Sequence, residues 1–240
     1  MRIHHKLANI LGYDLIRHKK SHHSLELHLK KIIDHLKTTL VLDIGANKGQ
    51  FAQKIRTLGF QGEIISFEPI PKEFERLKLL SSKDPKWEVY PYAIGSKNGT
   101  LELNITEEST DFTSFLKPNK FSKDYYSKEV SNIRTVPVEI HTLEDFFRTK
   151  KIIPEKVFLK TVTQGYDLEV LNGCGSLLQT LQGVLIEVSF QPIYENMPDA
   201  TTVIKYLDNH GFRASGFFPV SRNKNTLELI EMDGIFIKST

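Results

Sequence analysis

The segment from Leu40 to Leu58 constrains the fold of this 240-residue chain more than any other. It begins with an apolar run, Leu40 to Ile44, turns through Gly45-Ala46-Asn47-Lys48-Gly49, and continues as a helical pattern, Gln50 to Leu58. A buried strand, a tight turn and a helix in this order open a βαβ unit. Because short apolar runs alternate with helical patterns over the rest of the chain, we predict an α/β fold with a mostly parallel sheet.

Seven apolar runs are predicted as the strands of this sheet. In chain order they are Leu40 to Ile44, Glu63 to Phe67, Trp87 to Pro91, Lys156 to Val162, Val184 to Ser189, Phe212 to Phe217 and Gly234 to Lys238. The predicted helices are Leu25 to Leu36, Gln50 to Leu58, Pro71 to Leu80, Asp167 to Leu171 and Ala200 to His210. We expect residues 1–38 to form an N-terminal helical extension and residues 39–240 to form the main domain.

The segment from Gly95 to His141 is too long for an ordinary connection between two elements. Alternating runs at Thr100 to Ile105 and Thr135 to Ile140 predict a small β extension of the sheet. Between them, Glu107 to Asn132 is polar and aromatic. Two interpretations of this middle part stay open, a lid or binding loop and a plain surface loop.

Composition argues against several classes of protein. The formal net charge of +3 leaves no large excess of positive charge, so no nucleic-acid partner is predicted. The single cysteine, Cys174, rules out an intrachain disulfide and favours a reducing compartment, so we expect a cytoplasmic location. No run of about 18 apolar residues occurs, and we therefore predict no membrane span.

Seven of the nine histidines lie within the first 35 residues. His18 and His22 have the i,i+4 spacing that places two imidazoles on one face of a helix. No third ligand, such as a cysteine, completes a recognisable site. We favour a solvated helix face, and no metal is predicted.

The turn between the first strand and the first helix of the sheet has the features of a nucleotide site. Gly45 and Gly49 allow a sharp turn and a close approach of a ligand to the backbone. Glu68 follows nineteen positions after Gly49, at the end of the next predicted strand, where a carboxylate can accept hydrogen bonds from both hydroxyls of a ribose. A dinucleotide fingerprint needs glycine where Asn47 stands. The pattern therefore favours S-adenosylmethionine (SAM), which has no pyrophosphate, over NAD.

Several blocks of the sequence resemble the FkbM family of SAM-dependent O-methyltransferases. These blocks are Val41 to Phe51, Ser66 to Pro71, Ala93 to Gly95, Lys160 to Gly173 and Ile186 to Phe190. The resemblance covers about Leu40 to Lys238. It implies a Rossmann-like class I methyltransferase fold with seven strands, of which the last is antiparallel. It also implies methyl transfer to a hydroxyl, commonly on a sugar or a secondary metabolite.

The resemblance further implies the residues of the cofactor site. They are Asp43, Gly45, Ala46, Asn47, Gly49, Phe51, Glu68, Pro69, Tyr92 and Ala93. Gly45 and Asn47 would lie beside the methionine part of SAM, and Glu68 would hold the ribose. Tyr92 and Ala93 would flank the adenine. Because the sulfonium is cationic, we expect Asp43 to supply a negative charge near it or to bind the amino group through water.

Val162 departs from the pattern of the family. There the fourth strand ends in Lys-x-Asp-x-Gln/Glu-Gly, and Val162 occupies the position of the aspartate. A hydroxyl acceptor needs a base, which is worth about 10²–10⁴-fold in rate, and valine cannot accept a proton. Three interpretations stay open: an engineered replacement that traps a substrate or tests the base, a natural change in a binding homologue, or a chain in which another residue does the chemistry.

Five further residues are candidates for the acceptor end of the site. Lys160 is either a polar anchor or a solvated strand end, and Gln164 either binds a sugar hydroxyl or caps the next helix. Glu187 lies in an apolar strand, where a carboxylate costs free energy unless it is paired or protonated, so we favour a catalytic role over a structural salt bridge. Ser114 and Tyr194 are expected to contact the acceptor.

The leading hypothesis is a cytoplasmic SAM-dependent O-methyltransferase that acts on a hydroxyl of a glycan, a nucleotide sugar or a related metabolite, and that Val162 impairs. The alternative is a noncatalytic SAM- or glycan-binding module of the same fold. A third hypothesis, an NAD-dependent oxidoreductase, is disfavoured by Asn47. The protein is expected to be a monomer or a homodimer.

Overall fold

The seven runs predicted as strands form one sheet in the computed structural model, which describes residues 24–239. The strands are β1 Leu40–Ile44, β2 Glu63–Phe67, β3 Trp87–Tyr90, β7 Val157–Thr161, β8 Leu181–Ser189, β9 Phe212–Arg222 and β10 Leu229–Lys238. Their order is β3-β2-β1-β7-β8-β10-β9. The pairs among the first five strands of this order are parallel, and β10 is antiparallel to both β8 and β9. The antiparallel last strand is as expected.

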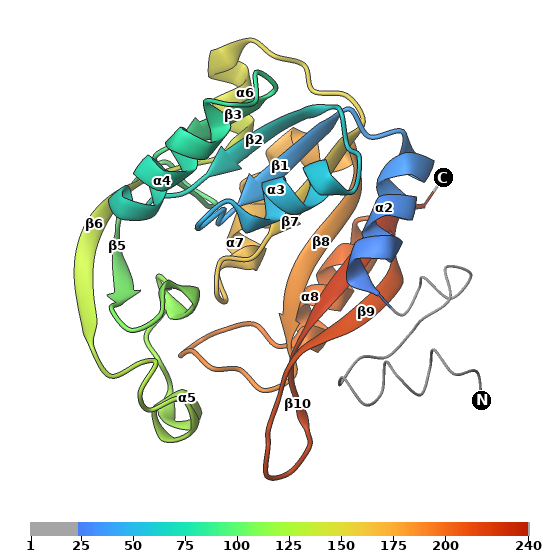
Figure 1. The fold of residues 1–240 in the computed structure, drawn as a ribbon. Coiled ribbons are helices and arrows are strands. Elements are labelled where there is room, and N and C mark those ends of the chain that lie inside the picture. The colour runs from blue at the N-terminus through green and yellow to red at the C-terminus, as the bar shows by residue number, and fades with distance from the viewer. Residues whose placement is uncertain (1–23, 240) are drawn as a thin grey trace, which may run out of the picture.

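Helices cover both faces of this sheet (Figure 1). On one face lie α2 Leu25–Leu36, α3 Gln50–Thr57 and α4 Pro71–Ser81. On the other face lie α6 Leu143–Lys150, α7 Asp167–Asn172, the 3-10 helix Gly175–Gln179 and α8 Ala200–Asn209. All five residues of β1 are buried because both faces of this strand are covered. The predicted α/β fold with a mostly parallel sheet is confirmed.

Helix α2 packs on the main sheet. Leu29, Ile32 and Ile33 share one side of the helix and are buried in the cluster that also contains Val41 and Ile55. The boundary after residue 38 stays a prediction. His18 and His22 lie outside the described residues.

The prediction that two strands of the segment from Gly95 to His141 extend the main sheet is wrong, because they pair with one another and not with it. The structure places β4 Ala93–Ile94, β5 Gly99–Thr106 and β6 Ile133–His141 in a separate three-stranded sheet of order β4-β6-β5. Leu103 and Val138 pack there against Ile70 at the start of α4, so this sheet has its own small core. The alternation of the sequence shows that two strands exist, but it does not determine their partners.

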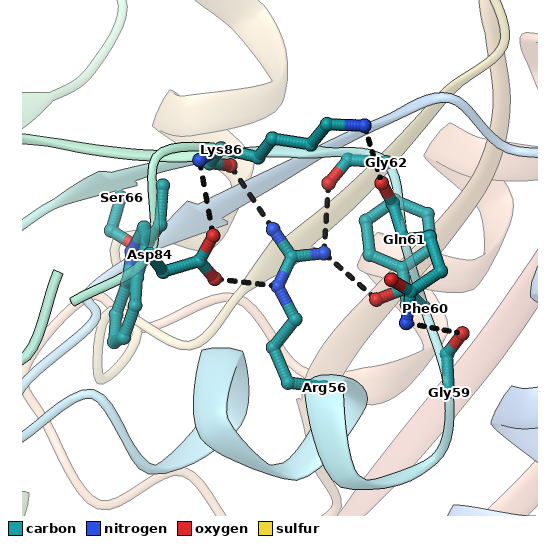
Figure 2. Close-up of polar contacts among 9 residues, drawn as sticks. Arg56, Gly59, Phe60, Gln61, Gly62, Ser66, Asp84 and Lys86 are labelled. Carbon is teal, nitrogen blue, oxygen red and sulfur yellow. Dashed lines mark hydrogen bonds and ion pairs between the residues drawn. The ribbon is translucent and has the colours of Figure 1, made fainter.

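Arg56 fixes the far end of α3 to the loops that precede β2 and β3 (Figure 2). Its Nε donates to Asp84 at 2.7 Å, and its Nη1 donates to the carbonyl oxygens of Phe60 and Gly62 at 2.9 and 2.8 Å. Its Nη2 donates to the Lys86 carbonyl at 3.1 Å. These charge-assisted bonds hold α3 against the sheet and so fix the direction in which its N-terminus points.

Within residues 24–239, no helix is both long and apolar enough to cross a membrane.

Candidate active site

A cavity of about 390 Å³ opens at the carboxyl ends of β1, β2, β7 and β8. In a parallel sheet, ligands bind at this edge where the strand order reverses, and here the reversal lies between β1 and β7. Ten of the predicted site residues line the cavity: Gly45, Asn47, Phe51, Glu68, Pro69, Ala93, Lys160, Val162, Gln164 and Glu187. Six do not line it: Asp43, Ala46, Gly49, Tyr92, Ser114 and Tyr194.

The turn after β1 leaves no room for a side chain at its first glycine. Gly45 has a φ of +70°, and a Cβ there would lie 2.3 Å from the carbonyl oxygen of Val162. Asn47 also has a positive φ, of 47°, which is uncommon for a residue with a side chain. The backbone of this turn is therefore held in a strained shape beside the cavity, as is frequent at ligand sites.

Glu68 closes the turn from the neighbouring strand. One oxygen of its carboxylate accepts from the backbone N–H of Asn47 at 2.7 Å, and the other accepts from that of Ile70 at 2.8 Å. Burial raises the pKa of Glu68 to about 7, although these two N–H groups act against the rise. Each carboxylate oxygen has a second lone pair that can accept from a ribose hydroxyl. The geometry fits the predicted ribose contact.

Asp43 and Lys160 form a buried ion pair beside the cavity, which Lys160 lines. The Nζ atom of Lys160 lies 2.9 Å from Oδ1 of Asp43, and it donates to the carbonyl oxygens of Ile44 and Gly45 at 3.1 and 2.8 Å. Two N–H groups of the ammonium are therefore bonded to the backbone of the turn, while the contact with Oδ1 of Asp43 is an ion pair without hydrogen-bond geometry. Lys160 holds the turn after β1 in place, and Asp43, which is fully buried and also accepts from Ser66, faces Lys160 instead of the cavity.

Four predicted acceptor residues are joined by hydrogen bonds. Gln164 donates from Nε2 to Glu187 at 3.2 Å, and its Oε1 lies 3.0 Å from the hydroxyl of Tyr194. Ser114 donates to the backbone carbonyl of Gln164 at 2.6 Å. Tyr194 and Ser114 are both buried, so they position Gln164 and do not themselves face the cavity.

Tyr92 lies away from the cavity. Its ring packs against those of Phe67, Tyr90, His141 and Phe146, with centroids 4.3 to 6.5 Å apart. Ala93, the next residue, lines the cavity. Adjacent residues of an extended chain point to opposite sides, which separates this pair.

A short segment of the long connection from Gly95 to His141 contacts the turn after β1, here called the cofactor turn, beside the cavity. Thr110–Phe112 forms a 3-10 helix, and Asp111 accepts from the side-chain amide of Asn47 at 2.9 Å. The hydroxyl of Thr110 donates to Oδ1 of the same amide at 3.3 Å. Because these contacts join a distant part of the chain to the turn, the geometry favours a binding loop over a plain surface loop.

A family model described as a methyltransferase FkbM domain matches residues 43–214. The chain belongs to this family. It is a methyltransferase domain with a Rossmann-like fold. No curated protein matches the chain in sequence.

Two solved structures similar to this FkbM domain come from bacteria. One is a methyltransferase FkbM from Methylobacillus flagellatus KT, with 10% identity and a TM-score of 0.49 over 82% of this chain and 43% of that one. The other is magnesium protoporphyrin IX methyltransferase from Synechocystis PCC 6803 with bound SAM, with 9% identity and a TM-score of 0.49 over 100% of this chain and 86% of that one. This chain thus spans less than half of the first structure, and the assignment rests on the family match.

Three carboxylates that line the cavity were not among the predicted site residues: Asp111, described above, and two on β10. Glu231 and Asp233 line the cavity from β10, which begins at Leu229 and not at Gly234. The sequence of the first part of β10 does not indicate a strand, because two acidic residues in a short run favour a loop over a buried strand. No group of three or more His, Cys, Asp or Glu side chains between residues 24 and 239 is arranged to hold a metal ion.

Proposed function

We propose that this protein transfers the methyl group of SAM to a hydroxyl of a sugar, a nucleotide sugar or a related metabolite, and that Glu187 takes the proton from that hydroxyl. Bound SAM supplies the electrophilic methyl group. The chain supplies the position of the acceptor and the base. The observation that carries the proposal is the place of Glu187 next to Val162.

Strand pairing defines this place. The register between β7 and β8 ends at Thr161 and Ile186, so Val162 and Glu187 are the next residues of the two neighbouring strands. Parallel strands lie about 4.8 Å apart, and residues at the same level point to the same side of the sheet. Both residues line the cavity. Val162 has no carboxylate, but Glu187 on the adjacent strand has one at the same level of the sheet.

The surroundings of Glu187 set the pKa of its carboxyl group. Burial raises the pKa of Glu187 well above its usual range, and nearby Glu231 and Asp233 raise it further. Glu187 accepts a proton only after it has lost its own, and the raised pKa then makes its carboxylate a stronger base. Gln164 donates to one of its oxygens and so fixes the direction of the other.

Kinetics of two variants test the base. A panel of sugars and nucleotide sugars is screened for methylated product by mass spectrometry, and the best acceptor is used to measure release of S-adenosylhomocysteine. Glu187→Gln is expected to lower turnover about 10²–10⁴-fold with little change in SAM affinity. Adding Val162→Asp to this variant should restore at least about tenfold. Glu195→Gln, an exposed site, is the charge-matched control.

Unchanged turnover in Glu187→Gln would refute the assignment of the base. A second function, a noncatalytic SAM-binding module, is favoured by the valine at position 162 alone. Binding of SAM by calorimetry, with no product from the parent chain or from Val162→Asp, would support it. We also place the reaction in the cytoplasm, because the single cysteine, Cys174, is buried and fits a reducing compartment.

A further inference from the structure

Three carboxylates gather where β8 and β10 pair. Asp233 lies directly opposite Glu187 in the antiparallel register, and Glu231 lies opposite Ser189. Residues opposite each other share a face of the sheet, and so do residues two apart on one strand. Glu187, Glu231 and Asp233 therefore point to the same side, and all three line the cavity.

This arrangement is costly in the protein alone. Like charges directly opposite each other destabilise a sheet, and buried charges without partners cost more. Among the described residues that line the cavity, Lys160 is the one basic side chain, and its charge is already matched by buried Asp43. Burial raises the pKa of Asp233 to about 6 and also raises the pKa of Glu231. Lys160 also lowers the pKa of Glu187 and of Asp233, so its one positive charge is shared among several carboxylates.

Glu231 shows where a partner is missing. Its side chain is more than nine-tenths buried, with 7% of the residue exposed. Its Oε2 accepts from the hydroxyl of Ser221 at 2.9 Å, but its Oε1 is buried and has no hydrogen-bond partner in the described part of the chain. A buried acceptor without a donor destabilises the folded protein. Glu231 lines the cavity, so a small rotation of its side chain would present Oε1 to a donor on a ligand there.

We propose that this end of the cavity binds a protonated amino group of the acceptor, so that the acceptor is an amino sugar or a similar amine-bearing molecule and not a neutral sugar. The inference rests on the proposed function for the identity of the acceptor site. An ammonium carries three N–H donors and a positive charge, so it satisfies Oε1 of Glu231 and neutralises the cluster at once. A hydroxyl supplies a donor but no charge.

The ribose end of the cofactor does not account for these carboxylates. Glu68, at that end, directly follows β2, and β10 is four strands away from β2 in the sheet order. At about 4.8 Å per strand, this separation is roughly 19 Å. Glu231 and Asp233 also lie beyond the residues matched by the family model, which end at 214. They therefore belong to the part of the site that is particular to this chain.

Binding of three related sugars tests the proposal. Calorimetry at pH 7 measures the affinities of glucosamine, N-acetylglucosamine and glucose for the protein saturated with S-adenosylhomocysteine. Glucosamine is expected to bind at least about tenfold more tightly than the other two, because charge-assisted bonds to a buried carboxylate add about 1.5–3 kcal/mol. Glu231→Gln should remove most of this preference, and Asp233→Asn should reduce it. Glu228→Gln, exposed just before β10, is the matched control.

Equal affinities for the three sugars would overturn the proposal, and so would failure of all three to bind. A preference that survives in both Glu231→Gln and Asp233→Asn would also overturn it. Binding of S-adenosylhomocysteine by each variant shows that its site is folded. If the parent chain does not bind S-adenosylhomocysteine, the proposed function is refuted, but the inference about the amino group is not. The affinities of the three sugars are then measured on the protein without S-adenosylhomocysteine.

Discussion

Replacing Gly45 by alanine perturbs the cofactor turn at its most crowded point. The new Cβ would lie 2.3 Å from the carbonyl oxygen of Val162, and real Cβ atoms stay at least 3.0 Å from other atoms. The loop after β7 must therefore move by at least about 0.7 Å, and such overpacking costs about 1–3 kcal/mol. The φ of +70° adds about 1–2 kcal/mol for a residue with a side chain. We expect a loss of about 2–5 kcal/mol in the free energy of unfolding.

Gly211→Ala is the control for the backbone part of this loss. Gly211 has a similar φ of +79°, but a Cβ there would meet only the flexible side chain of Lys238, at 3.7 Å. Urea unfolding of the two variants and the parent gives both losses on one scale. Gly45→Ala should lose about 1–3 kcal/mol more than Gly211→Ala, and its affinity for S-adenosylhomocysteine should fall. Equal losses in the two variants would refute the steric argument.

Two further predictions concern charged groups beside the cavity. Lys160→Met leaves Asp43 buried without its partner, so the free energy of unfolding should fall by about 3–5 kcal/mol in urea, and adding Asp43→Asn should recover part of it. A loss below about 1 kcal/mol would contradict the ion pair. Because burial raises the pKa of Glu68 from 4.5 to about 7, the folded state binds more protons than the unfolded state between these values, and stability falls as pH rises through them. Glu68→Gln should reduce this slope by up to about 1.4 kcal/mol per pH unit, and an unchanged slope would contradict the shift.

The elements that carry a strong local pattern could be predicted from the sequence. The bounds of β1, β2 and α2 agree with those expected, because each combines a clear apolar period with a turn or cap at its ends. The prediction of a cofactor site used the same segments, since the glycine turn and Glu68 both adjoin these strands.

Other elements depended on contacts that a local pattern does not contain. Helix α6 was missed, although Thr142 caps it by accepting from the backbone N–H of Asp145 at 3.1 Å, a signal that the sequence does carry. The start of β10 was missed because Glu231 and Asp233 interrupt its apolar run. Polar residues in a buried strand are what a cavity requires, so the pattern failed where the site lies.

The position of β10 also bears on when the protein can work during its synthesis. The ribosome releases β8 first, then β9 Phe212–Arg222, and only then the strand that must enter between them. Until that entry, β8 presents an open edge, and two of the three carboxylates that gather at one end of the cavity are absent from the nascent domain. The acceptor site proposed above is therefore completed last, when the final strand pairs with β8.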